Sequence, residues 1–552
     1  MKRQELKILG ASAVGTAFEW YDFFLYGALV PIIGAKFFGQ YGTAAQTVFA
    51  LLTFAVGFVF RPVGALIFAR LTDLIGRKVV FMITLVLMGV STLLVGLLPT
   101  SEQIGVLAPI LLLTCRILQG LAVSGEFGAA VTYVSEYAPR NQRGFFVGWL
   151  TGTTALALSL SLAVQIGVEA IVGSAAYSEW GWRVPFLISV VPLALSVWIR
   201  SKLDESPLFM QMKADGTRSK APLREAFGSW QRVRMIAIVF VMASAQSFIG
   251  YLSTVYLLTT MKVNLKVDSF TVNCIFMGAM LFGFFLCVFA SWLSDRVGRR
   301  PVLFAGLGLA ALTVFPITSA ITGATNPALE HARSNVTVVI HANPQDCSFQ
   351  FDPTGTTKFT SDCDRARKVL QAYSVEFSRA DVDGPTSVLV DQTEVAGGPT
   401  LEKDLVKAIG AAGYPIDGSA TTIKVSSVLD YFSWPVVKVS LLLLVLVACA
   451  QLAQGPASVA MAEVFPTRIR ATALAVPYQL GVGVFGGLLP ATMVAIGSQS
   501  GSLTTALWYP VVAMGIGLVI LLFTLPETKG VALSEVKLDE PDRAGNVPVT
   551  RH

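Results

Sequence analysis

The chain has 552 residues, of which 54% are hydrophobic and only 14% are charged, and its formal net charge is +6. A soluble globular protein carries about 25% charged residues, so this composition excludes a soluble enzyme, a nucleic-acid binder or a disordered scaffold for most of the chain. Three histidines and six cysteines also exclude a metalloprotein rich in these ligands.

Apolar stretches long enough to cross a bilayer recur along the sequence. A helix of about 20 apolar residues spans the hydrocarbon core. The predicted spans are 11–35, 46–69, 79–98, 106–134, 145–171, 184–199, 234–260, 270–292, 301–322, 434–457, 472–496 and 506–525. They form two sets of six, separated by a polar linker at 201–233. The sequence therefore predicts an all-α membrane protein with twelve transmembrane helices in two six-helix bundles.

The basic residues predict the orientation of these helices. Twenty Lys and Arg residues fall in the segments on one side, whereas the short loops on the other side hold about four. Because cytoplasmic loops carry the excess of Lys and Arg, we expect both termini in the cytoplasm and the protein in the plasma (inner) membrane.

Two motifs occur once in each half. The segment 72–78 (TDLIGRK) recurs as 294–300 (SDRVGRR), and 136–140 (EYAPR) recurs as 463–468 (EVFPTR). The motifs lie 63 residues apart in the first half (Asp73 to Glu136) and 168 apart in the second (Asp295 to Glu463), so the difference is 105 residues. This difference predicts an insertion between the ninth and tenth spans. Two parallel six-helix repeats are an architecture of secondary transporters.

The insertion, at 323–433, is polar and is expected to face outward as a small α/β module. Short β-branched runs predict strands at 336–340, 387–390 and 422–425, and helices are expected at 364–373 and 401–411. The remaining boundaries follow: an N-terminal bundle at 1–200, the seventh to ninth helices at 234–322, the tenth to twelfth at 434–530, and a cytoplasmic tail at 531–552.

Cys347 and Cys363 are the only cysteines outside the predicted spans. In an oxidising compartment they are expected to form a disulfide, with two free thiols as the alternative. The bridge would close a loop of about 15 residues and contribute about 3 kcal/mol in the chain-entropy model.

These motifs, with several others, resemble the major facilitator superfamily, specifically its metabolite:H⁺ symporters of the general substrate transporter type. The resembling segments are 15–27 (GTAFEWYDFFLYG), 61–64 (RPVG), both DxxGR loops, RxxQG at 116–120, WRxPF at 182–186, DESP at 204–207 and LPETKG at 525–530. They cover both halves and leave out the insertion. The resemblance implies twelve helices around one central cavity, and substrates such as organic acids, shikimate-like compounds, proline or betaine.

Ionisable residues lie inside the predicted spans. A charge at bilayer depth costs at least about 2.5–3.5 kcal/mol on insertion scales, so each needs a partner and a role. Glu19 and Asp22 lie near the middle of the first span, and Arg116 lies near the middle of the fourth. The resemblance implies that these helices meet at the cavity, so we expect a carboxylate–guanidinium pair.

Proton carriage is expected to fall to carboxylates, because no histidine lies in any predicted span. Asp22 is the first candidate and Glu19 the second, and protonation would break the pair with Arg116 and let the helices move. The alternative is a permanent structural ion pair. Glu126 is either a second proton station or a cap on neighbouring backbone. Arg61 is interpreted as a structural partner of the gating loop, with substrate binding as the alternative.

Polar residues on apolar spans are the candidates for substrate binding. They are Arg116, Gln119, Tyr21, Tyr26, Gln246, Tyr251, Tyr478 and Gln479. Polar side chains also join membrane helices to one another, so a purely structural role is the alternative for each. Gln246, Tyr251, Tyr478 and Gln479 belong to helices seven and eleven, which line the cavity in the resembled fold.

The repeated loops are expected to form a cytoplasmic gate. Their glycines permit a tight turn, their aspartates can face a helix N-terminus, and their arginines can reach carboxylates below the helices. The predicted gate residues are Asp73, Gly76, Arg77, Asp295, Gly298, Arg299, Glu136, Glu463, Arg140 and Arg468. The alternative is that these residues only anchor the cytoplasmic side.

The sequence thus predicts a proton-coupled symporter that imports a small polar metabolite, foremost an organic acid, by alternating access. A betaine- or proline-type zwitterion and a receptor that uses the outer module are the alternatives. We expect no enzyme activity, no metal site, no nucleic acid and no cofactor other than the proton gradient. The expected partners are the substrate, H⁺ and the lipid bilayer, with the protein as a monomer.

Overall fold

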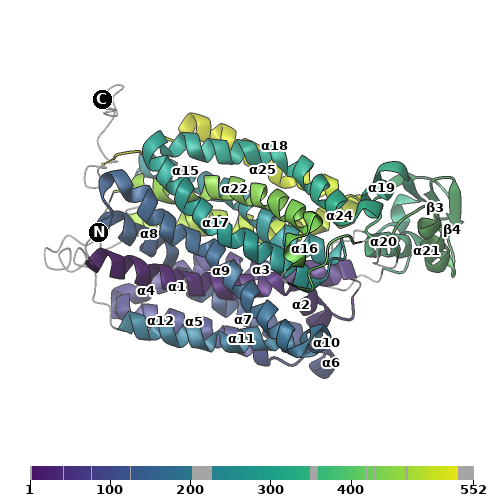
Figure 1. The fold of residues 1–552 in the computed structure, drawn as a ribbon, viewed down its shortest axis with the longest axis horizontal. Coiled ribbons are helices and arrows are strands. Elements are labelled where there is room, and N and C mark those ends of the chain that lie inside the picture. Colours follow the sequence, from purple (N-terminus) through teal and green to yellow (C-terminus); the bar gives the residue numbers. More distant parts are fainter. Residues whose placement is uncertain are drawn as a thin grey trace.

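The computed structural model describes residues 3–41, 43–75, 77–124, 126–201, 227–348, 359–416, 421–427, 429–466 and 470–531. The described chain forms an elongated helical bundle with a small α/β module at one end (Figure 1). The first helix begins, and the described chain ends, at the opposite end of the bundle. We call these two ends the insert end and the terminal end.

The first half of the bundle contains residues before 202. Its helices are α1 (Arg3–Ala28), α2 (Val30–Phe37), α3 (Thr43–Val59), α4 (Arg61–Ile75), α5 (Arg77–Leu97), α6 (Ser101–Ile104), α7 (Leu107–Val123), α8 (Glu126–Tyr137), η1 (Arg140–Gln142), α9 (Arg143–Val172), α10 (Ser174–Glu179), η2 (Gly181–Arg183), α11 (Val184–Ile188) and α12 (Val190–Ser201). The break between α3 and α4 precedes Pro62, which lacks the backbone N–H that a continuous helix would use.

The second half repeats this plan after residue 229. Its helices are α15 (Trp230–Tyr251), η3 (Leu252–Tyr256), α16 (Leu257–Val263), α17 (Ser269–Val297), α18 (Arg299–Thr325), α22 (Trp434–Glu463), α23 (Arg470–Tyr478), η6 (Gln479–Gly486), α24 (Gly487–Ser500) and α25 (Leu503–Thr524). The side chain of Asp268 caps α17 by accepting the N–H of Thr271. Gly298 ends this helix with a φ of 120°, which other residues rarely adopt.

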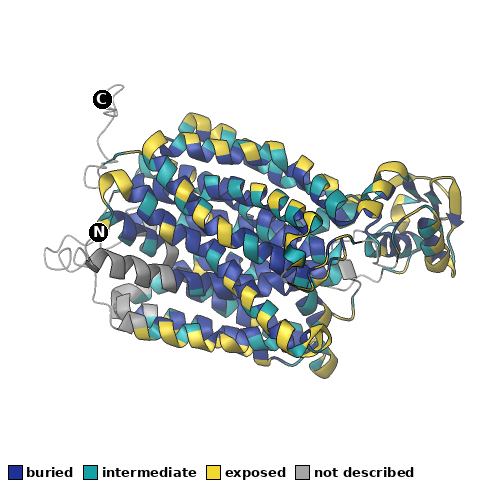
Figure 2. Ribbon diagram, in the orientation of Figure 1, coloured by how far each residue is buried: buried dark blue, intermediate teal, exposed yellow. Residues whose placement is uncertain are grey.

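Within the described residues, nine helices are long and apolar enough to cross a membrane, and Met82–Leu97 and Leu107–Val123 are shorter apolar helices. Buried residues run through the interior of the bundle, and exposed ones lie on its periphery (Figure 2). The protein is therefore a mostly helical, multi-pass membrane protein.

The two halves pack along a seam between α9 and α17. Glycines on α9 make this close approach possible. A Cβ at Gly148 would lie 2.6 Å from the Cβ of Ser291, and one at Gly152 would lie 3.0 Å from the Phe284 ring. Small residues four apart let membrane helices approach in this way.

The module at the insert end lies between α18 and α22. It contains α19 (Pro327–Asn335), β1 (Val338–Ala342), η4 (Pro344–Asp346), α20 (Asp362–Ala372), β2 (Ser378–Asp381), β3 (Ser387–Val390), β4 (Thr393–Ala396), α21 (Leu401–Ala411) and η5 (Asp430–Phe432). The sheet has the order β2-β1-β3-β4, in which β1 and β2 are parallel and the other neighbours are antiparallel. We call this module the inserted module.

The predicted strand at 422–425 is wrong. These residues instead tie the inserted module to the bundle: Thr422 N–H donates to the Thr325 carbonyl (2.9 Å) and Val425 N–H to Thr271 Oγ1 (2.7 Å). Strands β2 and β4 were not predicted, because neither segment has an alternating apolar pattern. The helix expected at 401–411 has the expected bounds.

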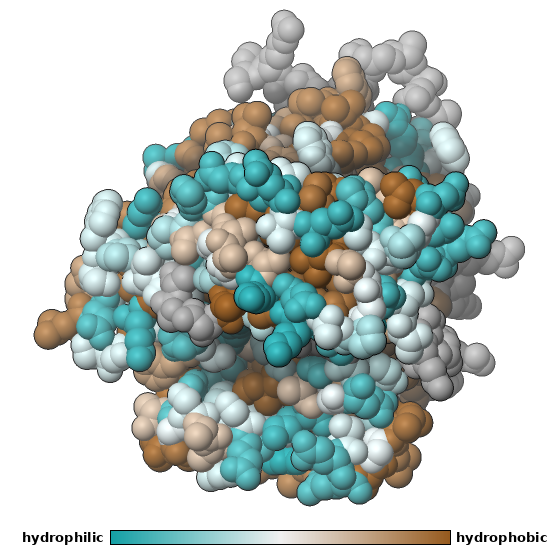
Figure 3. Space-filling model, turned by 90° about the vertical axis from the view of Figure 1, so that its right-hand side faces the viewer, coloured by the Kyte–Doolittle hydropathy of each residue, from teal (hydrophilic) through white to brown (hydrophobic). Residues whose placement is uncertain are grey.

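Further hydrogen bonds join the inserted module to loops of the second half. Ser374 Oγ donates to the Asn264 carbonyl (2.9 Å), Gln371 Nε2 to the Ser498 carbonyl (2.7 Å) and Phe377 N–H to the Gly501 carbonyl (3.1 Å). Toward the first half, α20 touches α3. From the insert end, hydrophilic side chains cover most of the surface, with larger hydrophobic groups at its edges (Figure 3).

The predicted disulfide between Cys347 and Cys363 is confirmed, with its Cα atoms 5.3 Å apart. It ties the segment after η4 to the start of α20.

Replacing Cys347 by Ser should loosen the inserted module. The loss of a loop constraint worth about 3 kcal/mol would raise its unfolded population by roughly two orders of magnitude. Limited proteolysis of the purified protein should therefore cleave the module faster. Cys449→Ser, at a buried free thiol in α22, is the control and should keep the wild-type rate. Equal rates for both variants would contradict a stabilising role of the bridge.

Candidate transport site

A small cavity, with about 60 Å³ of space for water-sized molecules, lies between the two halves. The polar and aromatic lining residues are Trp20, Phe24, Thr154, Gln246, Ser247, Tyr251, Ser253, Thr254, Gln451, Gln454 and Tyr478. No charged side chain is among the described lining residues. The cavity thus offers aromatic faces, amides and hydroxyls from both halves.

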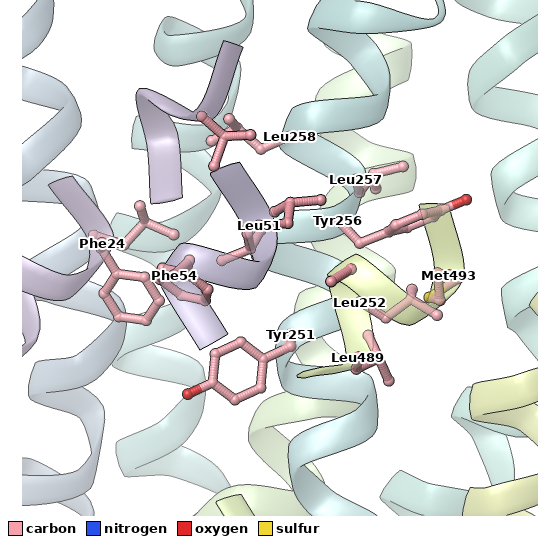
Figure 4. Close-up of a cluster of buried hydrophobic side chains, with 14 of the residues drawn as sticks. Phe24, Leu51, Phe54, Tyr251, Leu252, Tyr256, Leu257, Leu258, Leu489 and Met493 are labelled. Atoms are coloured by element: carbon pink, nitrogen blue, oxygen red, sulfur yellow. The ribbon is translucent and has the colours of Figure 1, made fainter. Parts of the chain in front are cut away.

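Aromatic and aliphatic side chains close the bundle between this cavity and the insert end. Figure 4 shows this outer cluster, drawn from α1, α3, the α15–α16 segment and α24. Its labelled members are Phe24, Leu51, Phe54, Tyr251, Leu252, Tyr256, Leu257, Leu258, Leu489 and Met493. The Tyr251 ring meets the Phe54 ring edge-on, with centroids 6.4 Å apart. Lys262 Nζ also donates to the Ala28 carbonyl (2.9 Å), which joins the two halves at this level.

Ion pairs close the terminal end. The carboxylate of Glu463 is completely buried and accepts from Arg143 (2.7 Å) of the first half and from Arg299 (3.2 Å) and Thr528 (2.7 Å) of the second. Arg470 pairs with Glu136 across the halves at 3.0 Å. We call these residues, with Asp295, the inner cluster.

Asp295 connects the two halves through hydrogen bonds to the backbone. Its two carboxylate oxygens accept the N–H groups of Gly144 and Phe145, each at 2.8 Å, in the first turn of α9. A carboxylate is stabilised there because a helix N-terminus carries partial positive charge. Asp295 also pairs with Arg299 at 2.7 Å.

The other predicted gate residues have different positions. Arg140 Nε donates to the Gly530 carbonyl, and a Cβ at Gly298 would lie 2.8 Å from the Glu527 carboxylate, which accepts the N–H of Arg299. Gly76 and Arg468, and the side chains of Asp73, Arg77 and Glu126, lie outside the described residues. The predicted gate does not include Arg143 and Arg470, although each follows a repeated motif by a few residues.

The expected ion pair between Asp22 and Arg116 is absent from the described residues. Asp22 is buried and accepts from Thr92 Oγ1 (2.8 Å), and Gln119 Nε2 donates to the same hydroxyl (2.6 Å). We call Asp22, Thr92 and Gln119 the polar chain. The neutral hydroxyl of Thr92 on α5 thus bonds to the Asp22 carboxylate, for which the guanidinium of Arg116 was the expected partner. No periodic pattern in the sequence predicts this contact.

Arg116 lies over an aromatic ring instead. Its guanidinium carbon is 3.7 Å from the centre of the Tyr26 ring, and none of its three nitrogens has a hydrogen-bond partner among the described residues. Glu19 is also buried, and its Oε1 has no partner there. Both carboxylates therefore lie inside the first half and away from lipid.

Of the predicted substrate residues, Gln246, Tyr251 and Tyr478 line the cavity. Tyr21, Tyr26 and Gln479 join helices instead. Tyr21 donates to the Pro185 carbonyl (3.3 Å), and Tyr26 donates to the Ala50 carbonyl (3.1 Å). Gln479 Nε2 donates to the Ser124 carbonyl at 2.9 Å. These contacts match the structural alternative for those side chains.

The prediction missed several lining residues, among them Trp20, Gln451 and Gln454. The two glutamines lie three residues apart in the apolar α22, a spacing that places them on one helix face. Helices α15 and α23 end at Tyr251 and Tyr478, and each is followed directly by a π-helical segment, η3 and η6. Such segments frequently mark functional sites, and the sequence carries no clear signal for them.

Two repeated helical halves around a central cavity, closed by contacts at both ends, define a secondary transporter of the membrane. The family model of the Major Facilitator Superfamily matches residues 12–329. The chain belongs to this superfamily and is a transporter, not an enzyme.

Two relatives from Escherichia coli K12 give a closer comparison. The chain is 35% identical to a proline/betaine transporter over 324 residues, which cover 57% of this chain and 64% of the relative. It is 32% identical to a shikimate transporter over 333 residues, which cover 58% of this chain and 73% of the relative. The chain therefore spans less than two thirds of the proline/betaine transporter's length.

Solved structures show the same fold. The proton:xylose symporter XylE bound to 6-bromo-6-deoxy-D-glucose aligns with a TM-score of 0.60 and 16% identity, covering 96% of this chain and 98% of XylE. A partially occluded inward-open structure of XylE from E. coli aligns with a TM-score of 0.59 and 15% identity, covering 96% of this chain and 99% of XylE.

Replacing Glu463 by Gln should open the terminal end. The substitution leaves Arg143 and Arg299 buried without their shared anion, a change that typically costs about 3–5 kcal/mol. A cysteine placed at the buried Ser135, in a background without the other free thiols, should then react faster with a membrane-permeant maleimide.

The matched control is Glu330→Gln, at a carboxylate of the inserted module that accepts from Ser319 Oγ (2.8 Å). This variant should keep the wild-type labelling rate. If the Glu463 variant also keeps it, the inner cluster does not hold the terminal end closed.

Proposed function

We propose that the protein is a proton-coupled symporter that imports a small zwitterion of the proline or betaine type. The observation that carries this proposal is the composition of the central cavity, whose described lining is aromatic, amide and hydroxyl but not charged. A lining without net charge suits a solute without net charge. The proline/betaine relative supports the same substrate class.

The aromatic residues suit the cationic end of such a solute. Trp20, Phe24, Tyr251 and Tyr478 come from both halves. A quaternary or secondary ammonium over such ring faces is attracted by the ring quadrupole, by about 0.5–2 kcal/mol per contact. Gln246, Gln451 and Gln454 add hydrogen-bonding groups around it.

Proton binding is assigned to the polar chain. Asp22 accepts from the Thr92 hydroxyl, which in turn accepts from Gln119. This direction of donation suits an ionised carboxylate. A proton on Asp22 Oδ2 would be donated to the Thr92 hydroxyl, which would then donate to the Met88 carbonyl (3.1 Å) instead. Protonation would thus weaken the contact between α1 and α5, because the accepting group would no longer be charged. Glu19 is the second candidate, and the positive charge of Arg116 would favour the ionised state.

Helix α1 would couple the two sites. Trp20 and Phe24 are four residues apart and therefore share one face of the helix, which lines the cavity. Asp22 lies halfway between them in the sequence and so projects from another face, toward α5. A movement of α1 on proton binding would therefore also move two aromatic side chains of the cavity.

Transport would then proceed by alternating opening of the outer and inner clusters. We assign the terminal end to the cytoplasm and the inserted module to the outside of the plasma membrane, as the distribution of Lys and Arg predicts. The residues in contact with the substrate would be Gln246, Tyr251, Tyr478, Trp20 and Gln451.

An organic anion is the second candidate. Two buried guanidinium groups, Arg61 and Arg116, have nitrogens without hydrogen-bond partners among the described residues. They would supply positive charge for a carboxylate, and the shikimate relative fits this class.

Uptake of radiolabelled proline, glycine betaine and shikimate into proteoliposomes tests the substrate class. With an inward proton gradient, the zwitterions should accumulate and should compete with one another. Accumulation of shikimate alone would overturn the zwitterion proposal and support the second candidate.

Replacing Asp22 by Asn should abolish accumulation driven by the proton gradient while substrate exchange at equal pH continues, because the amide keeps its size but carries no proton. The control is Glu169→Gln, at a buried carboxylate of α9 that accepts from Ser174 Oγ (2.7 Å), and it should accumulate substrate normally. Proton-driven accumulation in the Asp22 variant would contradict the proton site.

A further inference from the structure

We propose that Arg61 binds the carboxylate of the transported solute, at the surface where the two halves meet below the central cavity. This inference rests on the proposed function, because it assigns one residue to one end of the substrate. It replaces the earlier interpretation of Arg61 as a partner of the gating loop.

Arg61 is buried and has no anionic partner among the described residues. Its side chain is 1% exposed, and its Nε and Nη2 atoms have no hydrogen-bond partner among the described residues. Two other fully buried arginines, Arg299 and Arg470, form ion pairs with Glu463 and Glu136. A buried guanidinium without such a partner is strongly unfavourable. An anion that arrives during transport would supply the missing partner.

Aromatic rings stabilise the guanidinium of Arg61 while no solute is bound. Its central carbon lies 4.1 Å from the centre of the Phe58 ring, 4.2 Å from that of Phe23 and 5.2 Å from that of Trp20. Cation–π contacts of this kind stabilise a charge without using its N–H groups. The N–H groups thus stay available for a ligand.

The position of Arg61 connects it to the cavity and to both halves. Trp20, which packs against it, lines the cavity. Phe58, which also packs against it, meets the ring of Tyr251 of the second half with centroids 5.5 Å apart, and Tyr251 lines the cavity. The Tyr251 hydroxyl has no hydrogen-bond partner among the described residues. A carboxylate here would lie next to groups from both halves.

The internal repeat argues that the fold itself does not need this charge. Arg61 lies twelve residues before Asp73, and the residue twelve before Asp295 in the second half is Gly283. A Cβ at Gly283 would lie 2.8 Å from the side chain of Val447, so this position serves close helix packing. A charge needed to build the six-helix unit would be expected in both copies.

A guanidinium presents two parallel N–H groups that match the two oxygens of a carboxylate. With the carboxylate at Arg61, the ammonium end of a small zwitterion would point into the cavity, toward Tyr251, Tyr478 and Trp20. Both charged ends of the solute would then be recognised, although the cavity lining itself is uncharged.

The test compares two ligands that differ in the carboxylate. Glycine betaine and choline share the quaternary ammonium, but choline has a hydroxyl in place of the carboxylate. Binding to the purified full-length protein is measured by titration calorimetry. The wild type should bind betaine roughly 10–100-fold more tightly than choline, as expected for a hydrogen-bonded charge pair. Arg61→Gln should lower betaine affinity to that of choline and leave choline affinity unchanged.

Two further variants complete the design. Arg61→Lys keeps the charge but not the paired N–H groups, so its preference for betaine should be intermediate; it also serves if Arg61→Gln does not fold. Arg365→Gln removes an arginine of the inserted module that pairs with Asp362 and Glu402, and it should keep the full preference. If wild-type protein binds neither ligand, the proposed substrate class fails. If the wild type prefers betaine and both Arg61 variants keep that preference, the assignment of Arg61 is wrong.

Discussion

The cost of burying charge among membrane helices determines most of this structure. At the terminal end, the carboxylates of Glu463 and Asp295 satisfy arginine side chains and helix N–H groups from both halves. In the middle, Asp22 is satisfied by a hydroxyl, whereas Arg61 and Arg116 rest on aromatic rings. Ionic groups are thus paired where the halves are held together and only partly paired where solute and proton would bind.

The two ends of the bundle are closed by different forces. The outer cluster is aromatic and aliphatic, so opening it exposes apolar surface to water. The inner cluster consists of ion pairs, whose opening loses strong attractions but gains hydration of the separated charges. These two penalties depend differently on temperature and salt. Between the ends, the glycine-lined seam of α9 and α17 keeps the halves in contact.

Much of the fold was predictable, because helix spans and repeats leave direct signals in a sequence. The spans, the duplicated loops, the inserted module and its disulfide all appear as runs, spacings or cysteine positions. The site was less predictable. Tyr251 and Tyr478 were found because polar groups are rare in apolar helices, but the contact of Asp22 with Thr92 depends on how α1 and α5 are rotated. Similarly, residues 422–425 do not form the expected strand, because the N–H groups of Thr422 and Val425 donate to residues of distant helices.

The attachment of the inserted module has a mechanical consequence. Its described hydrogen bonds run to loops and helix ends of the second half, whereas toward the first half α20 touches α3. The inserted module would therefore move together with the second half whenever the two halves rotate relative to one another. Its edge at α20 would separate from α3 and return in each cycle, so a bulky molecule bound between them would block the movement without contacting the central cavity.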